Sequence, residues 1–327
     1  MKAIVRTAYG SPDVLQLQEV EKPVPKDGEV LIQVHAASVN ALDWHYMRGQ
    51  PFPVRIGGNG LRKPKDPRLG VDLAGRVEAV GGNVTRFQPG DDVFGSGAGA
   101  FAEYACAADN RLVLKPANLS FEQAASVPVA AITALQGLRD KGQIQPGQQV
   151  LIQGASGGVG TFAVQIAKSF GAEVTAVCSA QNVAMARSIG ADHVIDYTQA
   201  DFTKNGQQYD LILAVNGYHP ILAYRRALRP AGTYVMVGAS NAHLMQALLQ
   251  AMLLGPVISR TGGKRVANFS AKLNQKDLVF MQELLAAGTI VLVIDRCYLL
   301  HETAEAIRYL EAGHARGKVV IAVEHNG

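Results

Sequence analysis

The chain has 327 residues, which is enough for about two domains of ordinary size. Of these residues 48% are hydrophobic and 18% are charged, and the net charge of +4 gives little support to nucleic-acid binding. No apolar run approaches the roughly 18 residues that a membrane span needs, and the first residues carry no signal or transit pattern. We therefore expect a cytoplasmic globular protein that has neither a nucleic acid nor a membrane as partner.

The chain contains three cysteines, Cys106, Cys178 and Cys297. They are far apart in the sequence and never form a CxxC pair, which argues against both a disulfide framework and a thiolate metal cage. We expect three buried free thiols.

The first part of the chain, to about residue 120, contains short β patterns separated by turn signals. These patterns are MKAIVR, EVLIQVHAASV, GRVEAVG and DDVFG. They predict a small antiparallel barrel or sandwich. From Phe121 the pattern becomes helical, and strands then alternate with helices, as in βαβ units.

The strands of this second region are near-continuous apolar runs. They lie at 150–155, 173–178, 193–197, 210–215 and 233–238. Such runs are typical of parallel strands that helices cover on both faces. After the first run, apolar residues recur at helical spacing as far as Phe170, and Gly171 follows where a C-terminal cap belongs.

The tail, from about residue 272, returns to a mixed pattern. It predicts a helix at 277–288, a strand at 290–299, a helix at 303–313 and a last strand at 318–323. We expect this tail to rejoin the N-terminal domain. The predicted domains are therefore 1–123 together with 272–327, and 124–271.

The glycine-rich segment QGASGGVG, at 153–160, leaves an apolar strand and opens an amphipathic helix. That context favours a dinucleotide-binding turn over a merely tight turn, because the glycines let a pyrophosphate approach the backbone at a helix N-terminus. The residues predicted to form this site are Gly154, Ala155, Ser156, Gly157, Gly158, Val159 and Gly160.

The second strand of this region ends in CSAQN, where an NAD-binding protein usually places an acid against the adenine ribose. No acid is present. Ser179 and Asn182 are able to donate hydrogen bonds to a 2′-phosphate, so NADP(H) is the expected cofactor. The alternative is that Ser179 is only a polar loop residue.

With these features, the chain resembles the medium-chain dehydrogenase/reductase superfamily and, within it, the zinc-independent quinone oxidoreductase branch. The resemblance is carried by SVNALDWHYMRG at 38–49, LGVDLAGRVEAVG at 69–81, PGDDVFG at 89–95, SVPVAAITALQGL at 126–138, GASGGVG, RSIGADHVIDY at 187–197 and GHARGKVVIAV at 313–323. It implies an α/β fold in which a Rossmann doubly wound parallel sheet accompanies a GroES-like β-barrel domain. It also implies a nucleotide cleft between the two domains and, commonly, a homodimer.

The zinc branch of the superfamily would place its metal ligands at the positions of Asn40, Val71 and Val129. Valine has no donor atom and an asparagine amide is a poor ligand, so no metal is expected.

The same resemblance implies roles for single residues. Asn40 would lie near the nicotinamide, and Thr133 would contact the nicotinamide end of the cofactor. The remaining cofactor contacts would come from Ser179 and Tyr197 beside the 2′-phosphate with Asn182 next to them, from Asn216, Gly238 and Ser240 along the groove, and from Arg316 and Lys318 in the tail. Asn40 in an Asx turn, Asp43 as a helix cap and Tyr46 as a core aromatic residue are the open alternatives.

These residues favour an enzyme that passes a hydride from NADPH to a quinone or a related activated carbonyl compound. Asn40 and Tyr46 are the candidate catalytic hydrogen-bond donors to the acceptor oxygen. Two alternatives stay open. One is reduction of an alkenal or enone at its carbon–carbon double bond, and the other is a nucleotide-binding protein whose catalysis is vestigial.

The segment RIGGNGLRKPKDPR, at 55–68, gathers basic residues among glycines and prolines. It is either a solvated loop or a lid that selects an anionic acceptor.

Overall fold

The computed structural model describes residues 1–327 except 57–59, 241, 262 and 326–327. The chain forms two compact units. Unit 1 comprises Met1–Ala130, Leu273–Gly288 and Ile294–Gly327, and unit 2 comprises Ala131–Lys272 and Thr289–Val293. The predicted split lies at 123/124, whereas the division between the units falls within α3 (Pro128–Gln136).

Unit 1 is built on a seven-stranded sheet. Six of its strands follow the order β14-β15-β3-β4-β5-β7, and the seventh, β6, pairs with β3. The strands are β3 (Glu29–Val39), β4 (Asp72–Val80), β5 (Asp92–Ser96), β6 (Tyr104–Ala108), β7 (Leu112–Leu114), β14 (Ile294–Leu299) and β15 (Lys318–Ala322), and β1 (Lys2–Val5) pairs separately with β2 (Gln16–Glu19). The tail strand β15 pairs antiparallel with β3, with Val320 opposite Ser38. The tail therefore completes the N-terminal sheet, as expected.

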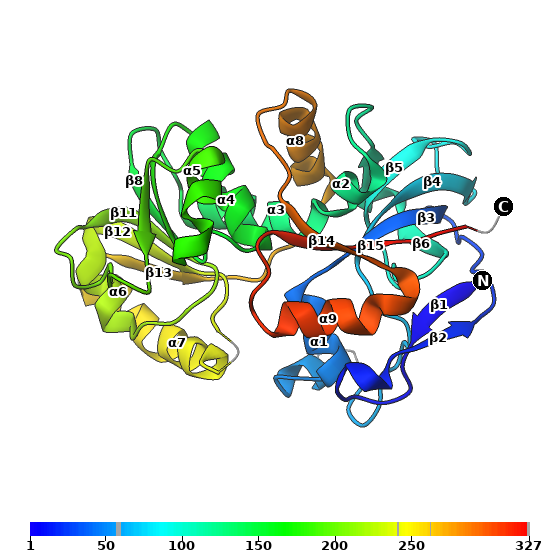
Figure 1. Cartoon of the computed structure of the whole chain (residues 1–327), viewed down its shortest axis with the longest axis horizontal. Coiled ribbons are helices and arrows are strands. Elements are labelled where there is room, and N and C mark those ends of the chain that lie inside the picture. The colour runs from blue at the N-terminus through cyan, green and yellow to red at the C-terminus, as the bar shows by residue number, and fades with distance from the viewer. Residues whose placement is uncertain (57–59, 241, 262, 326–327) are drawn as a thin grey trace. The chain divides into compact units, whose positions relative to one another are not determined.

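The helices that accompany this sheet include α1 (Ala41–Arg48), α2 (Phe121–Ala125), α8 (Gln275–Ala286) and α9 (Thr303–Glu311). Helices α1 and α9 are far apart in sequence but pack side by side (Figure 1). The core of the unit contains Ile32, Leu73, Phe101 and Ile321, which are fully or almost fully buried.

Unit 2 is a six-stranded parallel sheet in the order β10-β9-β8-β11-β12-β13. The strands are β8 (Gln149–Gln153), β9 (Glu173–Cys178), β10 (His193–Asp196), β11 (Tyr209–Ala214), β12 (Leu228–Met236) and β13 (Arg265–Asn268). Helices α4 (Gly158–Ser169) and α5 (Val183–Ser188) cover one face, and α6 (Ile221–Ala227) and α7 (Leu244–Thr261) cover the other (Figure 1). The predicted Rossmann-type sheet and its first five strands are confirmed.

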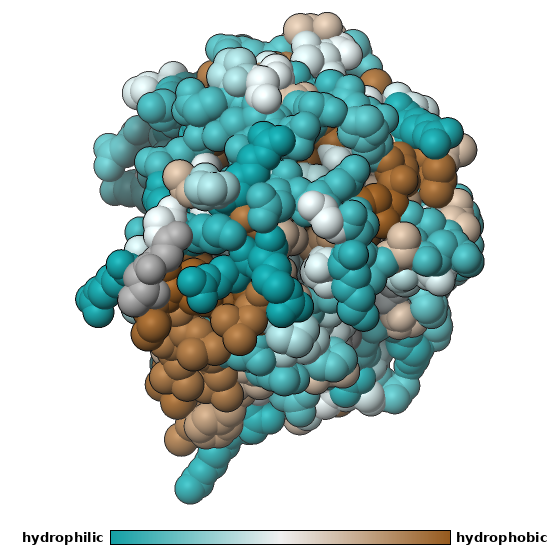
Figure 2. All heavy atoms as spheres, turned by 90° about the vertical axis from the view of Figure 1, so that its left-hand side faces the viewer, coloured by the Kyte–Doolittle hydropathy of each residue, from teal (hydrophilic) through white to brown (hydrophobic). Residues whose placement is uncertain are grey.

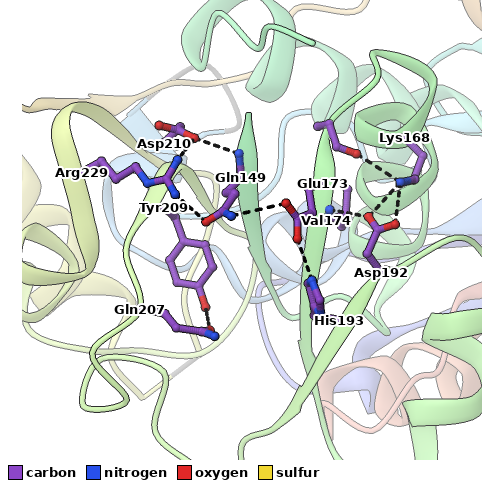
Figure 3. A network of polar contacts seen from close by, with 11 residues as sticks. Gln149, Lys168, Glu173, Val174, Asp192, His193, Gln207, Tyr209, Asp210 and Arg229 are labelled. Carbon is purple, nitrogen blue, oxygen red and sulfur yellow. Dashed lines mark hydrogen bonds and ion pairs between the residues drawn. The ribbon is translucent and has the colours of Figure 1, made fainter. Parts of the chain in front are cut away.

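Charged and amide side chains join the amino ends of these parallel strands (Figure 3). The Asp210 carboxylate accepts hydrogen bonds from the Gln149 N–H at 2.8 Å and from the Arg229 guanidinium at 3.0 Å. His193 and Glu173, at the starts of β10 and β9, lie 2.7 Å apart through Nε2 and Oε1. Polar contacts therefore link the strands at their amino ends. The glycine-rich turn lies at the opposite edge of the sheet, at the carboxyl ends of the strands.

The cysteines lie in different environments. Cys178 is buried and Cys106 is half-buried, but Cys297 is exposed. The prediction of three buried thiols is therefore confirmed only for Cys178. Cys297 lies on β14, which among the described strands is at the edge of the sheet and pairs with β15.

Candidate active site

The glycine-rich turn follows the end of β8 and is pinned to the neighbouring strand β9. The backbone N–H groups of Gly154 and Ala155 both donate to the Val177 carbonyl oxygen at 3.1 Å. Gly154 has φ +80°, a left-handed conformation that side chains disfavour. The chain therefore turns sharply at the strand end and directs the N-terminus of α4 toward this edge.

The close packing of the turn requires a second glycine. A Cβ atom on Gly160 would lie 2.1 Å from the Gly154 carbonyl oxygen, so only glycine fits there. At Gly157, by contrast, the nearest atom to such a Cβ is 3.7 Å away, which leaves one side of the turn open. The first N–H groups of a helix have no partner within it, and no acidic residue lies in the first turn of α4. This arrangement fits a pyrophosphate, so the residues present can hold a dinucleotide.

Ser179 and Tyr197 leave neighbouring strands at the same level. Cys178 at the end of β9 is paired in register with Asp196 at the end of β10, and each of the two predicted residues comes next in the chain. The Asn182 side-chain amide donates to Ser179 Oγ at 3.0 Å, which leaves the serine hydroxyl hydrogen able to donate elsewhere. Tyr197 is exposed, whereas Asn182 is buried. The fold thus brings Ser179, Asn182 and Tyr197 to one corner of the carboxyl edge.

Asn216, Gly238 and Ser240 follow the carboxyl ends of β11 and β12. Asn216 accepts a hydrogen bond from the Gly217 N–H through Oδ1 at 2.8 Å. The Ser240 N–H donates to the Gly217 carbonyl at 3.3 Å, so the two loops contact each other. These three predicted residues therefore share the edge that carries the glycine-rich turn, where open α/β sheets bind their ligands.

Thr133 lies on α3, a helix made almost entirely of buried apolar residues. It is half-buried, while its neighbours Ile132 and Ala134 are fully buried. Thr133 is therefore a polar and partly accessible residue of this part of the helix.

Unit 1 contains a buried network of polar groups that centres on Asn40. The Asn40 Oδ1 atom accepts from the Lys318 ammonium at 2.6 Å, and its Nδ2 donates to Asp72 Oδ2 at 2.8 Å and to the Ser38 carbonyl at 3.3 Å. The ammonium also lies 3.7 Å from Asp72 Oδ2. Because a cation and a carboxylate flank the amide, its oxygen and nitrogen are unambiguously assigned. Both amide hydrogens of Asn40 are thus already used within the protein.

This network changes the interpretation of Lys318. The tail residue was expected to reach the cofactor, but its side chain is 3% exposed and its ammonium also donates to the Val39 carbonyl. A contact with a cofactor would require the ammonium to leave these partners. Asp72 was not among the predicted site residues, although an acid between the apolar residues Val71 and Leu73 was a signal that could have found it.

Burial controls the ionisation of the acids in this network. Burial raises the pKa of Asp43 to about 7, although the hydrogen bond that it accepts from the Asn40 N–H at 2.7 Å favours the charged form. Burial also raises the pKa of Asp72, and the Lys318 ammonium opposes that shift. The hydrogen bond from the Asn40 N–H to Asp43 caps the N-terminus of α1. Asp43 therefore acts as a helix cap, which was the alternative interpretation of this residue.

The three positions that the resemblance equates with zinc ligands all lie around Asp72. Asn40 donates to its carboxylate, Val71 precedes it in the chain, and the Val129 N–H donates to its Oδ1 at 3.1 Å. The cation beside that carboxylate is the Lys318 ammonium. Over the described residues, no group of three or more His, Cys, Asp or Glu side chains is placed to hold a metal ion.

The other predicted residues lie at the surface of unit 1 or partly within it. Tyr46 is half-buried on α1 and packs against the core, while its carbonyl oxygen accepts a hydrogen bond from the Arg6 guanidinium. The Arg316 side chain is exposed, and its backbone N–H donates to Asp295 Oδ2 at 2.9 Å.

Some basic side chains of the segment at 55–68 contact other residues of the protein, and others are exposed. The Arg68 guanidinium donates two hydrogen bonds to Asp66, at 3.0 and 2.9 Å, and the Arg55 guanidinium lies over the Tyr9 ring, 4.6 Å from its centroid. Arg62, Lys63 and Lys65 are exposed. Residues 57–59 of the segment lie outside the described residues.

Comparison with known proteins places this geometry in a family. Residues 26–117 match the family model described as an alcohol dehydrogenase GroES-like domain, and residues 189–321 match one described as a zinc-binding dehydrogenase. The NAD(P)H oxidoreductase RTN4IP1, mitochondrial, of Bos taurus is 33% identical over 99% of this chain and 89% of its own length. The 2-methylene-furan-3-one reductase of Solanum lycopersicum is 32% identical over 98% of this chain and 79% of its own length. The quinone oxidoreductase structure from Coxiella burnetii has a TM-score of 0.87 at 31% identity, and the match covers 99% of both chains.

The chain belongs to the medium-chain dehydrogenase/reductase superfamily, in its quinone oxidoreductase branch. The resemblance drawn from the sequence motifs is thereby confirmed. As a member of this family the chain is an oxidoreductase that uses NADP(H).

Proposed function

We propose that this oxidoreductase reduces quinones or related activated carbonyl compounds with NADPH and without zinc. The observation that carries the proposal is the set of groups around Asp72. At the three zinc-ligand positions, two valines offer no donor atom, and the Asn40 amide is held by Lys318 and Asp72. The protein therefore contributes binding and orientation to the reaction, with no metal to polarise the acceptor.

The groups along the carboxyl edge of unit 2 are the candidates for holding the nucleotide. Gly154 to Gly160 would receive the pyrophosphate, and Ser179 with Tyr197 would flank the 2′-phosphate. When bound, NADPH supplies the hydride. No carboxylate follows β9, where an NAD-binding protein usually places the acid that would repel a 2′-phosphate.

An activated carbonyl compound demands little further chemistry from the protein. Conjugation in a quinone delocalises the negative charge that develops, and one hydrogen-bond donor at the acceptor oxygen is enough to stabilise it. Because both Asn40 amide hydrogens are used internally, we assign to Asn40 the role of a positioning residue at the start of α1. Tyr46 is then the better candidate for the donor.

A second candidate activity is the reduction of an activated carbon–carbon double bond. It is favoured by the likeness to the Solanum lycopersicum protein, which is named as a reductase of a methylene-furanone. Both activities consume NADPH, so the distinction needs product analysis. Turnover of quinones with no saturated product from enones supports the first proposal, and saturated ketone products support the second.

The deciding experiment follows the oxidation of NADPH over a panel of quinones and enones, before and after treatment with a chelator. Activity that persists in metal-free protein supports the proposal, whereas stoichiometric zinc lost together with activity would overturn it. Calorimetric titration should show NADPH binding at least about tenfold tighter than NADH, a difference of about 1.4 kcal/mol. A protein that binds NADPH but turns over none of the panel would be a nucleotide-binding protein with vestigial catalysis.

A homodimer and a cytoplasmic location complete the proposal. The homodimer is supported by the resemblance to the branch, and light scattering tests it. The location rests on the sequence pattern alone, and cell fractionation tests it. The relatives whose names give a compartment include a mitochondrial protein.

A further inference from the structure

Helix α7 presents its large apolar side chains to solvent. Met245, Leu249, Met252, Leu253 and Val257 are all exposed, with Met252 at 64% and Leu253 at 70%. These positions follow the spacing i, i+4, i+7, i+8 and i+12, so they form one continuous stripe on the helix. Figure 2 shows a hydrophobic patch on the side of the molecule where α7 lies. We call these five residues the α7 stripe.

The opposite face of α7 carries smaller residues. Ala247, Ala251 and Ile258 are buried, and a Cβ on Gly255 would lie 3.1 Å from the Val266 side chain of β13. Close packing on the sheet explains these small residues. It does not explain the large ones, because surface helices normally bury their large apolar residues and expose polar ones. A contiguous exposed apolar patch of this kind marks an interaction surface.

The stretch of sequence that contains the α7 stripe carries charges of one sign. Residues 211–276 contain no Asp or Glu, and their charged residues are Arg225, Arg226, Arg229, Arg260, Lys264, Arg265, Lys272 and Lys276. Arg260 continues the stripe itself, three residues beyond Val257, and is exposed. The Lys264 ammonium donates to the Arg225 and Leu228 carbonyls at 2.8 and 2.6 Å, so the end of α6 with its exposed arginines lies beside the end of α7. Exposed arginines therefore lie on the stripe at Arg260 and at the neighbouring end of α6 at Arg225 and Arg226.

We propose that the α7 stripe docks on the surface of a bilayer that contains anionic phospholipids. An exposed apolar helix face next to arginines is the combination that inserts at the boundary between headgroups and acyl chains, with the cations on the phosphates. Among the described residues, no helix is both long and apolar enough to cross a bilayer, and α7 would lie along the surface. The expectation of no membrane partner rested on the absence of a spanning segment, and surface docking does not need one.

The charge pattern favours lipid over a second copy of this chain. In a two-fold contact the same surface is present on both sides. Residues 211–276 of a second copy would therefore offer these arginines no acid as partner. Anionic headgroups would neutralise these arginines directly. The proposal goes beyond the reductase activity, and its test needs no turnover.

The test is flotation of the full chain with vesicles of phosphatidylcholine alone and of phosphatidylcholine mixed with phosphatidylglycerol. We expect binding to the anionic vesicles, weakened by salt, and at least tenfold weaker binding to the neutral ones. The variant M252Q/L253Q should reduce binding to the anionic vesicles at least tenfold. The variant V24Q, which alters another apolar side chain that is 82% exposed, should bind like the wild type. The variant R225Q/R226Q/R260Q should lose the preference for anionic lipid.

Circular dichroism and NADPH titration of each variant verify that it is folded. Equal vesicle binding by M252Q/L253Q and the wild type would overturn the proposal, and so would the absence of wild-type binding to anionic vesicles at low salt. If M252Q/L253Q instead converts a dimer to a monomer in light scattering while no protein binds vesicles, a second copy covers the stripe and the lipid proposal is wrong.

Discussion

Replacement of Lys318 by Met tests whether the buried network stabilises unit 1. Methionine has a similar length, so the change removes the charge with little loss of volume. It leaves the Asp72 carboxylate fully buried without a cation, and it removes the donor from Asn40 Oδ1 and from the Val39 carbonyl. Breaking a buried ion pair from one side costs about 3–5 kcal/mol, because the remaining charge is uncompensated. We expect the free energy of unfolding of unit 1 to fall by about that amount.

The assay is urea unfolding followed by tryptophan fluorescence. Trp44 is the single tryptophan of the chain, it is 8% exposed, and it belongs to the core of unit 1 beside Asp43. Its signal therefore reports on the unit that contains the network. Lys22, in the same unit, forms a surface ion pair with Glu78, and Lys22→Met is the matched control with an expected cost of about 0–1 kcal/mol.

The double variant Lys318→Met/Asp72→Asn separates lost packing from uncompensated charge. Asparagine keeps an acceptor for the Val129 N–H and removes the buried carboxylate. The double variant should therefore be more stable than the sum of the two single effects predicts, by about 1–3 kcal/mol. If Lys318→Met costs no more than Lys22→Met, or if the two changes add, the ammonium does not stabilise unit 1 in the way proposed.

Three other changes test separate parts of the site. Gly160→Ala should weaken NADPH binding, measured by calorimetry, at least about tenfold, because a Cβ there would lie 2.1 Å from the Gly154 oxygen and would displace the turn. An unchanged affinity would contradict the role of this turn in binding. Asp43 has a pKa raised to about 7, so its contribution to the free energy of unfolding is present below its ordinary pKa and is lost as pH rises toward 7. Asp43→Asn should remove this part of the pH dependence of unfolding, about 1.4 kcal/mol per pH unit, and the same pH dependence in wild type and variant would refute the pKa shift. Replacing the exposed residues Arg62, Lys63 and Lys65 by Ser should lower kcat/KM for an anionic quinone and weaken the salt dependence of that kcat/KM. The kcat/KM for an uncharged quinone and the affinity for NADPH should stay unchanged, and equal losses of kcat/KM for both quinones would point to a folding role.

The parallel sheet was predictable because its strands are buried on both faces. The near-continuous apolar runs at β8, β9 and β11 predict buried parallel strands. The observed ends of these three strands lie within two residues of the predicted ends. The tail strand was predicted too long, from 290 to 299, although β14 begins at Ile294. Gln165 explains the difference, because its side chain bonds both the N–H and the carbonyl of Val291, at 2.7 and 2.9 Å, and holds that segment in unit 2.

The site was predictable where backbone geometry decides it and less so where side chains meet. The turn at Gly154 and Gly160 follows from glycine spacing, since close approach needs glycine whatever surrounds it. The Lys318 contacts depend on β15 pairing with β3, which joins positions 278 residues apart in the chain for the Lys318–Asn40 bond. A lysine that begins an apolar strand gives no sign of whether it points inward. Its role therefore had to come from the structure.

Two features that could not be predicted from the sequence are the buried charges of unit 1 and the exposed apolar face of α7. Both depart from the rule that charged residues lie at the surface and large apolar residues lie in the core. Unit 1 buries Lys318, Asp72 and Asp43 in its interior, and α7 exposes large apolar side chains. Each arrangement costs stability by itself, since a buried charge loses its hydration and an exposed apolar side chain keeps water ordered around it. Folded proteins depart from these rules mainly at functional sites. The buried charges surround the three positions that the resemblance equates with zinc ligands. The same exception argues that the α7 stripe also has a ligand, and a lipid surface is the one that the nearby arginines fit.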